Sequence, residues 1–164
     1  EFLGDAKVSL ANGRFIMVIN YPNTYWRFDP GTYPGKDAKR GAARQISGGP
    51  FVHLEAVQAL LKSCEFDTDQ LWLATEKCEK DLLKESWSIH DVLQLLTDLD
   101  GAADYYKSEW CEVLGGRFVP CDVYRTPYDA VRKRRHPKGL LVYIKFSIEA
   151  DGALTIALVS CHAA

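Results

Sequence analysis

The residues best suited to chemistry lie in the C-terminal half of the chain, on short runs that have the pattern of strands. They are Lys107, Arg125, Tyr143, Lys145 and His162. Histidine transfers protons near neutral pH, whereas lysine and arginine stabilise negative charge on phosphate oxygens. Tyrosine donates a proton or stacks on a nucleobase. Together these residue types could transfer a proton and stabilise negative charge.

Each of these residues also has an ordinary structural interpretation. The neighbours of His162 along its run are mostly apolar, which fits a buried histidine or one that simply ends a strand. Tyr143, like Tyr124 before it, fits an aromatic residue of a half-buried sheet, and Lys145 fits a solvated strand residue. The residue types alone leave both interpretations open.

Two of these runs alternate between apolar and polar residues, as strands with one buried face do. In 141–148, Tyr143 and Lys145 point to the same side. In 154–162, five residues are expected to share a face: Leu154, Ile156, Leu158, Ser160 and His162. Asp151-Gly152 between the two runs is a strong hairpin signal. The C-terminal half is therefore predicted to be a largely antiparallel sheet.

Three helices are predicted upstream of this sheet. They cover 52–62, 75–84 with Thr75 as the N-cap, and a stretch from Ser88, which begins a capping box, to about residue 100. A strand is predicted within 66–74. This order of elements predicts an α+β fold in which helices pack on an antiparallel sheet.

The first 49 residues are predicted to form an N-terminal extension of the main domain, which covers residues 50–164. Residues 7–21 have the pattern of a hairpin with a type I′ turn at Asn12-Gly13. Residues 22–50 are rich in proline, glycine, aromatic and basic residues, and are predicted to be a loop. Such an arm either stacks on bases and binds phosphate, or covers the surface and packs through its own aromatic rings.

The net charge of −2 conceals an uneven distribution along the chain. Residues 52–112 are strongly acidic, whereas residues 113–164 have an excess of basic side chains. This asymmetry is typical of a domain that meets a polyanion on one face, although solvated helices also carry acids. Five cations gather in a predicted loop over 126–138, where they either contact phosphate or stay solvated: Arg132, Lys133, Arg134, Arg135 and Lys138.

The cysteines and the apolar runs exclude several classes of protein. The five cysteines lack a C-x-x-C pair and no Asp, Glu and His cluster stands out, so neither a metal site nor a cofactor is expected. The thiols of Cys121 and Cys161 are expected to be buried, because nothing indicates a lowered pKa. No apolar run approaches about 18 residues and no signal peptide is apparent, so a cytoplasmic protein that contacts no membrane is predicted.

Four short runs, in a common order and with compatible spacing, resemble successive motifs of the MqsR family over about residues 50–162. This family comprises small messenger-RNA-cleaving toxins of bacterial type II toxin–antitoxin systems, and it has a RelE-like fold. The four runs are Asp104-Tyr105-Tyr106-Lys107-Ser108, Asp122-Val123-Tyr124-Arg125, Val142-Tyr143-Ile144-Lys145 and Leu158-Val159-Ser160. The resemblance implies a RelE-like fold for residues 50–164 and RNA cleavage as the activity.

The resemblance assigns roles to individual residues. Lys107 falls on the active-site lysine of the family, and Tyr143 falls on the tyrosine of its Y-x-K strand. His162 takes the place of a final lysine thought to be catalytic, and Cys121 takes the place of a glutamine. A histidine near the N-terminus of some members would fall two residues before His53.

These implications give a specific hypothesis, a toxin that cleaves messenger RNA at selected sequences without a metal ion, by attack of the 2′-oxygen. His162 would transfer a proton, and Tyr143 would donate one or stack on a base. Lys107 and Arg125 would stabilise the charge of the phosphorane, and Lys145 would hold the RNA backbone.

The resemblance also implies a protein partner, the cognate antitoxin, and it leaves a homodimer open. The alternative hypothesis is a catalytically degenerate relative that binds RNA or a protein through the same sheet. It arises because Cys121 and His162 replace the glutamine and the last lysine of the family.

Overall fold

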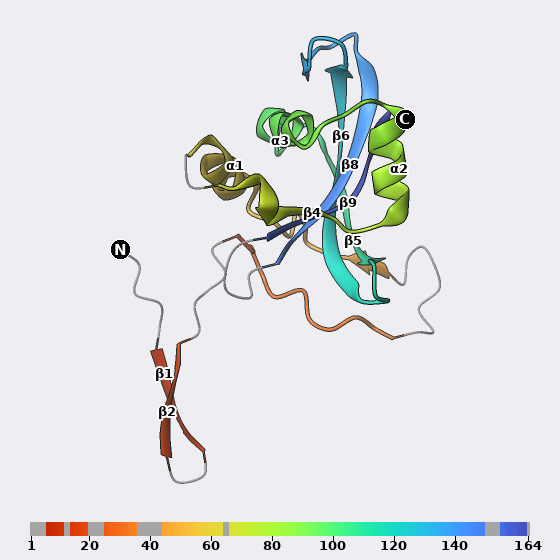
Figure 1. Ribbon diagram of the computed structural model, residues 1–164. Helices are drawn as coiled ribbons and strands as arrows, with labels where there is room; N and C mark the ends of the chain where they lie inside the picture. Colours follow the sequence, from red (N-terminus) through yellow and green to blue (C-terminus); the bar gives the residue numbers. More distant parts are fainter. Residues whose placement is uncertain are drawn as a thin grey trace.

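The computed structural model describes residues 6–11, 14–19, 25–35, 44–63, 66–149 and 155–163. Within these ranges the chain has an α+β fold, with three α-helices and a mostly antiparallel, seven-stranded open sheet (Figure 1). This confirms the predicted fold class. The helices are α1 (Leu54–Lys62), α2 (Glu76–Lys84) and α3 (Ile89–Asp98), and a 3₁₀ turn covers Thr68–Gln70.

The seven-stranded sheet is built around an antiparallel meander of four long strands. The strands follow the spatial order β3 (Gln45–Ile46), β5 (Tyr105–Glu112), β6 (Phe118–Asp129), β8 (Leu140–Glu149), β9 (Thr155–Ala163) and β4 (Leu71–Leu73). The short β7 (Arg134–Arg135) pairs with the end of β6, and β4 runs parallel to β9. The antiparallel pairing of β8 with β9 agrees with the predicted hairpin, whose Asp151-Gly152 turn lies outside the described residues.

Side-chain caps fix where two of the helices begin. The hydroxyl of Thr75 accepts a hydrogen bond of 3.0 Å from the backbone N–H of Cys78, in the first turn of α2. Ser88 and Asp91 form a reciprocal capping box at the start of α3, with bonds of 3.2 and 2.9 Å. Each cap satisfies an N–H group that the helix itself leaves unpaired. Both predicted starts are confirmed.

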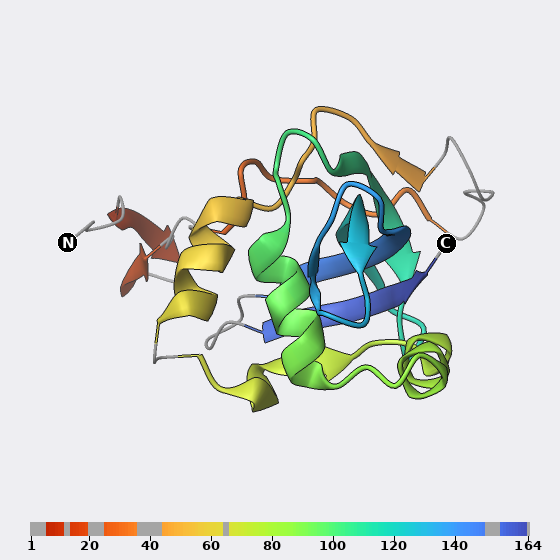
Figure 2. The same cartoon turned by 90° about the horizontal axis from the view of Figure 1, so that it is seen from above.

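All three helices pack on the same face of the sheet. One buried cluster combines side chains of α1, α2 and α3 with one face of β6, β8 and β9, and includes Leu54, Cys78, Leu95, Ile144 and Leu158. In Figure 2, α3 lies between α1 and α2, in front of the strands. No described helix covers the opposite face, which is therefore free to carry polar chemistry.

A β-bulge in β9 determines which way the last residues point. Ser160 pairs with Lys145, whereas Leu158 pairs with the next residue of β8, so Val159 is the extra residue. Leu158 consequently points into the core below the helices, while Ser160 and His162 point to the opposite face. The prediction that these three residues share one face was wrong, because alternation along a sequence does not reveal an inserted residue.

The predicted loop over 126–138 is shorter in the structure. β6 continues to Asp129, and Arg134 and Arg135 pair with its end as β7. Packing explains the difference, because Tyr128 is buried in the core with its ring centroid 5.8 Å from that of Trp87. This contact accompanies continuation of the strand past Pro127 to Asp129.

The N-terminal strands form a separate sheet. β1 (Ala6–Ala11) and β2 (Arg14–Ile19) pair in antiparallel fashion, which confirms the predicted hairpin. The Asn12-Gly13 turn between them lies outside the described residues.

The arm over 25–35 packs on the main domain. The ring of Trp26 lies 5.0 Å from that of Phe51, and its indole N–H donates a 3.0 Å hydrogen bond to the carbonyl of Ile148. Tyr33 stacks almost parallel on Phe118, with 3.8 Å between the ring centroids. These rings contact the core and the sheet. The division of the chain at residue 49 stays a prediction.

A buried carboxylate joins the segment before α1 to the central strand. Asp122 of β6 accepts hydrogen bonds from the backbone N–H groups of Phe51, at 3.0 Å, and Val52, at 2.7 Å. The hydroxyl of Ser108 donates a third bond to the same carboxylate. Burial raises the pKa of the Asp122 carboxyl above its ordinary value, and the three donors act against that rise. The side chain thus supplies acceptors for backbone groups that water does not reach.

We expect Asp122→Ala to destabilise the fold, because it leaves two buried N–H groups without an acceptor. An unsatisfied buried donor costs about 1–3 kcal/mol, so the free energy of unfolding should fall by at least about 2 kcal/mol in urea titrations. The matched control is Glu79→Ala, which removes an exposed carboxylate from α2 and should change stability by less than about 0.5 kcal/mol. Equal decreases in the two variants would contradict the anchoring role of Asp122.

Candidate functional site

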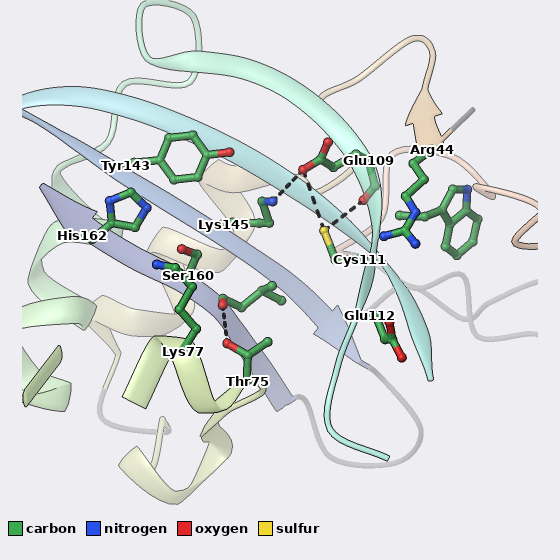
Figure 3. A pocket seen from close by; sticks show the side chains of 12 residues that line it. Arg44, Thr75, Lys77, Glu109, Cys111, Glu112, Tyr143, Lys145, Ser160 and His162 are labelled. Carbon is green, nitrogen blue, oxygen red and sulfur yellow. Dashed lines mark hydrogen bonds and ion pairs between the residues drawn. The ribbon is translucent and has the colours of Figure 1, made fainter. Parts of the chain in front are cut away.

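The face of the sheet opposite the helices carries the candidate site. A second cluster of buried residues, which includes Cys111, Cys121 and Val159, forms part of this face. A cavity of about 600 Å³ opens beside it (Figure 3). The cavity is lined by Arg44, Thr75, Lys77, Glu109, Trp110, Cys111, Glu112, Tyr143, Lys145, Val159, Ser160 and His162.

One row of side chains crosses four strands of this face. Tyr143 and His162 are cross-strand partners on β8 and β9, and their rings stack with centroids 5.3 Å apart and 19° between the planes. Arg125 of β6 is the partner of Tyr143 on its other side. The guanidinium of Arg125 lies 3.6 Å from the ring centroid of Tyr106 on β5. The structure thus brings three of the predicted catalytic residues together in register.

The chain itself orients the imidazole of His162. Its Nδ1 lies 2.9 Å from the carbonyl oxygen of Ala163, and because a carbonyl oxygen only accepts, Nδ1 carries the hydrogen in this bond. Nε2 has no hydrogen-bond partner among the described residues. Nε2 is therefore the atom available for proton transfer, as an acceptor when the ring is neutral and as a donor when it is protonated.

Glu109, which was not a predicted site residue, joins two residues that were predicted, Lys107 and Lys145. One oxygen of Glu109 lies 2.6 Å from Nζ of Lys145, and the other lies 2.7 Å from Nζ of Lys107. The Glu109 side chain is only 14% exposed. Val123 of β6, fully buried, stands between the two lysines in the register of the sheet. We call this arrangement the lysine–glutamate bridge.

The bridge shifts the pKa of each of its three groups. A hydrogen bond to Glu109 raises the pKa of Lys107. Burial by itself would lower the pKa of Lys145, but negative charge on Cys111 and on Glu109 raises it above its ordinary value. Burial would likewise raise the pKa of Glu109, but hydrogen bonds from both lysines hold it below its ordinary value. All three groups are consequently charged at neutral pH.

Two further cations reach the cavity from outside the meander. Arg44, next to β3, lines it with its guanidinium 5.0 Å from the ring centroid of Phe118. Lys77, in the first turn of α2, lines it as well and is paired with Asp81. Neither was a predicted site residue. The position of Arg44 in an aromatic and basic arm was the one sequence signal, whereas Lys77 resembles any solvated helix residue.

The buried thiols behave in two ways. The expectation for Cys121 and Cys161 is confirmed, because both are buried and burial raises the pKa of each thiol. Cys111, which lines the cavity, differs from them. A hydrogen bond with Cys121 lowers the pKa of Cys111, and the positive charge of Lys145 acts in the same direction. Because Cys121 is fully buried, the position of the family glutamine presents no side chain to the cavity.

The predicted RNA-binding loop lies outside the cavity, and part of its charge is neutralised. Arg135 donates to the buried carboxylate of Asp104 at 2.5 Å. Lys133 lies 3.7 Å from a carboxylate oxygen of Asp91 and 4.4 Å from the ring centroid of Trp87. Lys133 thus contacts Asp91, in the first turn of α3, and Trp87, just before α3. Both groups lie on the side of the sheet that the helices cover. These two cations therefore have structural roles.

The other three loop cations are more exposed. Arg132 approaches Asp129 at 3.9 Å. Arg134 and Lys138 are exposed and have no carboxylate partner among the described residues. A smaller cavity of about 480 Å³ connects this region to the row of catalytic candidates, since Arg125 and Arg135 both line it.

Two other histidines lie away from the site. His53 precedes α1 and its Nδ1 is 3.4 Å from a carboxylate oxygen of Glu55. His90 is exposed in the first turn of α3, as predicted. Neither residue lines the cavity.

The described part of the chain contains no group of three or more His, Cys, Asp or Glu side chains placed to hold a metal ion. None of the described helices is long and apolar enough to cross a membrane. Comparisons with protein-family models, with curated proteins and with solved structures give no match for this chain. The chemistry of the cavity is therefore the basis for a functional proposal.

The lysine–glutamate bridge predicts how stability depends on pH. Because the folded pKa of Glu109 lies below its ordinary value of 4.5, the contribution of the bridge is complete above about pH 4.5 and is lost as the pH falls through the folded pKa. We expect the free energy of unfolding of the wild type, relative to that of Glu109→Gln, to be constant from about pH 5 to 8 and to decline below that range. A difference that stays constant down to about pH 3 would contradict the bridge.

Proposed function

We propose that this protein is an endoribonuclease of the toxin type, related to the MqsR family and with a RelE-like fold, which cleaves messenger RNA without a metal ion. One observation carries the proposal. Tyr143, Lys145 and His162, which lie on two different strands, line a single cavity on the open face of the sheet. Lys107 joins them through the bridge, and Arg125 joins them through the row of side chains.

The cavity contains the groups that cleavage by the 2′-oxygen requires. The reaction needs a base for the 2′-hydroxyl, cations for the charge of the phosphorane, and an acid for the departing 5′-oxygen. Nε2 of His162 is a proton-transfer group, and Nζ of Lys145 and the guanidinium of Arg44 are cations that face the same space. Tyr143 adds a hydroxyl and a ring on which a base can stack.

The arrangement of the sheet supports the same proposal. The motifs that resemble the family lie on β5, β6, β8 and β9, which are neighbours in space. The motif residues Lys107 and Tyr143 lie on the open face of the sheet, as His162 does. As in that family, the cognate antitoxin would be the protein partner and the cytoplasm the site of action. A homodimer is left open by this proposal.

His162→Ala should abolish most of the activity, because it removes the free imidazole nitrogen from the cavity. We expect the rate of cleavage of a structured RNA of several hundred nucleotides, in excess EDTA, to fall by about 10²- to 10⁴-fold. His90→Ala is the matched control, since it removes an exposed histidine from α3 and should cleave at the wild-type rate. Equal rates for His162→Ala and the wild type would exclude His162 from proton transfer.

A second candidate function is RNA binding without cleavage. It is favoured by the bridge, in which the negative charge of Glu109 is paired with Lys145 of the cavity and with Lys107. The exposed pair Arg134 and Lys138 favours it as well. This function needs the cations of the sheet and the loop but not the imidazole of His162.

The salt dependence of RNA binding tests the loop in either function. In a His162→Ala background, we replace both Arg134 and Lys138 by Ala. The slope of log K against log salt should become shallower by about 0.7 for each phosphate that the variant no longer neutralises. The control replaces Lys80 and Lys84, exposed lysines of α2, and should leave the slope unchanged. An unchanged slope for the loop variant would show that the loop does not contact RNA.

A further inference from the structure

Glu109 is an unusual residue for a cavity that would bind phosphate. It is not part of the four runs that resemble a known family, and a carboxylate there repels an anionic ligand. It is nevertheless the central group of the bridge, with each of its oxygens held by a different lysine. A residue that weakens ligand binding yet is held this firmly is a candidate for a chemical role.

The contacts leave Glu109 able to accept a proton. A carboxylate oxygen has two lone pairs. Oε1 of Glu109 accepts from Nζ of Lys145 and, at 4.0 Å, from the thiol of Cys111. Oε2 accepts from Nζ of Lys107 alone among the described residues, so it keeps one lone pair. Lys107 has three N–H donors and uses one on Glu109, so two remain for phosphate oxygens. Lys145 donates to Glu109 and to Cys111, so one of its donors remains. A phosphodiester bound by these lysines would therefore place its adjacent ribose beside the carboxylate.

The cavity also presents a second group that transfers protons. Tyr143 and Lys145 are two residues apart on β8 and point to the same face, and their partners on β9 are His162 and Ser160. Figure 3 shows Glu109 and Lys145 in the middle of the cavity and His162 beside Tyr143 at one end. Glu109 and His162 thus line one cavity from different strands, β5 and β9, and both are groups that transfer protons.

We propose that Glu109 is the general base of this site and that His162 is its general acid. The inference rests on the proposed ribonuclease function and gives a role to a residue that the sequence did not single out. Lys107 and Lys145 then have two roles, because they keep Glu109 ionised and they bind the phosphate on which it acts.

These assignments balance the protons of the cleavage step. A Glu109 oxygen takes the proton of the 2′-hydroxyl while the 2′-oxygen forms a bond to phosphorus. The bond between phosphorus and the 5′-oxygen breaks, and that oxygen takes a proton from Nε2 of the protonated His162. The products are a 2′,3′-cyclic phosphate and a 5′-hydroxyl. Exchange with water then returns Glu109 to the carboxylate and His162 to the imidazolium.

The test compares full-length wild type, Glu109→Gln and Glu109→Asp in the RNA cleavage assay in EDTA, from about pH 4 to 9. Glu109→Gln keeps the size and the polarity of the side chain but cannot take the proton, so kcat should fall by about 100-fold or more. KM should stay the same or decrease, because the lysines are released to bind phosphate. The acidic limb of the profile of kcat/KM against pH should disappear. Glu109→Asp, which keeps a carboxylate, should retain that limb.

Glu149→Gln is the matched control. Glu149 is also a partly buried strand carboxylate in an ion pair, with Arg117, but it lies outside the cavity. This variant should cleave like the wild type. The unfolding midpoint of each variant, measured in the same buffers, establishes that all four proteins are folded under the assay conditions.

Two results would overturn the inference. If Glu109→Gln keeps its kcat and the acidic limb, or cleaves faster than the wild type, then Glu109 is only a counter-ion of the lysines. If Glu109→Gln raises KM and leaves kcat unchanged, its role is to position the lysines. Failure of the wild type itself to cleave RNA is a different outcome, because it refutes the proposed function and the assignment of Glu109 with it.

Discussion

The two faces of β6 determine where the rest of this protein lies. On one face, the buried carboxylate of Asp122 holds the backbone of Phe51 and Val52, and the three helices pack on the same side. On the other face, the next residue, Val123, stands between the two lysines of the bridge. Because successive residues of a strand point to opposite sides, one short run serves both the core and the site. The anchor therefore confines the polar chemistry to the open face.

On that open face, the main physical problem is to hold several cations close together when no ligand is bound. Glu109 reduces the repulsion between Lys107 and Lys145, and it fixes both Nζ atoms at hydrogen-bonding distance. The bridge keeps one net positive charge, and Arg44 adds another at the wall of the cavity. Donors held in this way need little reorganisation when negative charge develops on a bound phosphate, which is the situation that stabilises a phosphorane.

Local signals in the sequence predicted the helices and strands, whereas contacts between strands determine which side chains meet in the site. The caps at Thr75 and Ser88 and the alternation along β8 act within a few residues, so they are visible in the sequence. The bulge at Val159 arises from pairing with β8, and it puts Ser160 and His162 on the face opposite to that of Leu158. The two lysines that pair with Glu109 lie on its own strand and on β8. The sequence therefore shows the glutamate but not its contacts with both lysines.

Cleavage of RNA by attack of the 2′-oxygen, on the open face of the sheet, is the central proposal for this protein. The most direct measurement is the chemical identity of the new ends formed when the purified protein acts on RNA in excess EDTA, with DNA of the same sequence alongside. We predict 5′-hydroxyl and 2′,3′-cyclic phosphate ends from RNA and no cleavage of DNA, which has no 2′-hydroxyl. New 5′-phosphate ends, cleavage of the DNA, or intact RNA would contradict the proposal.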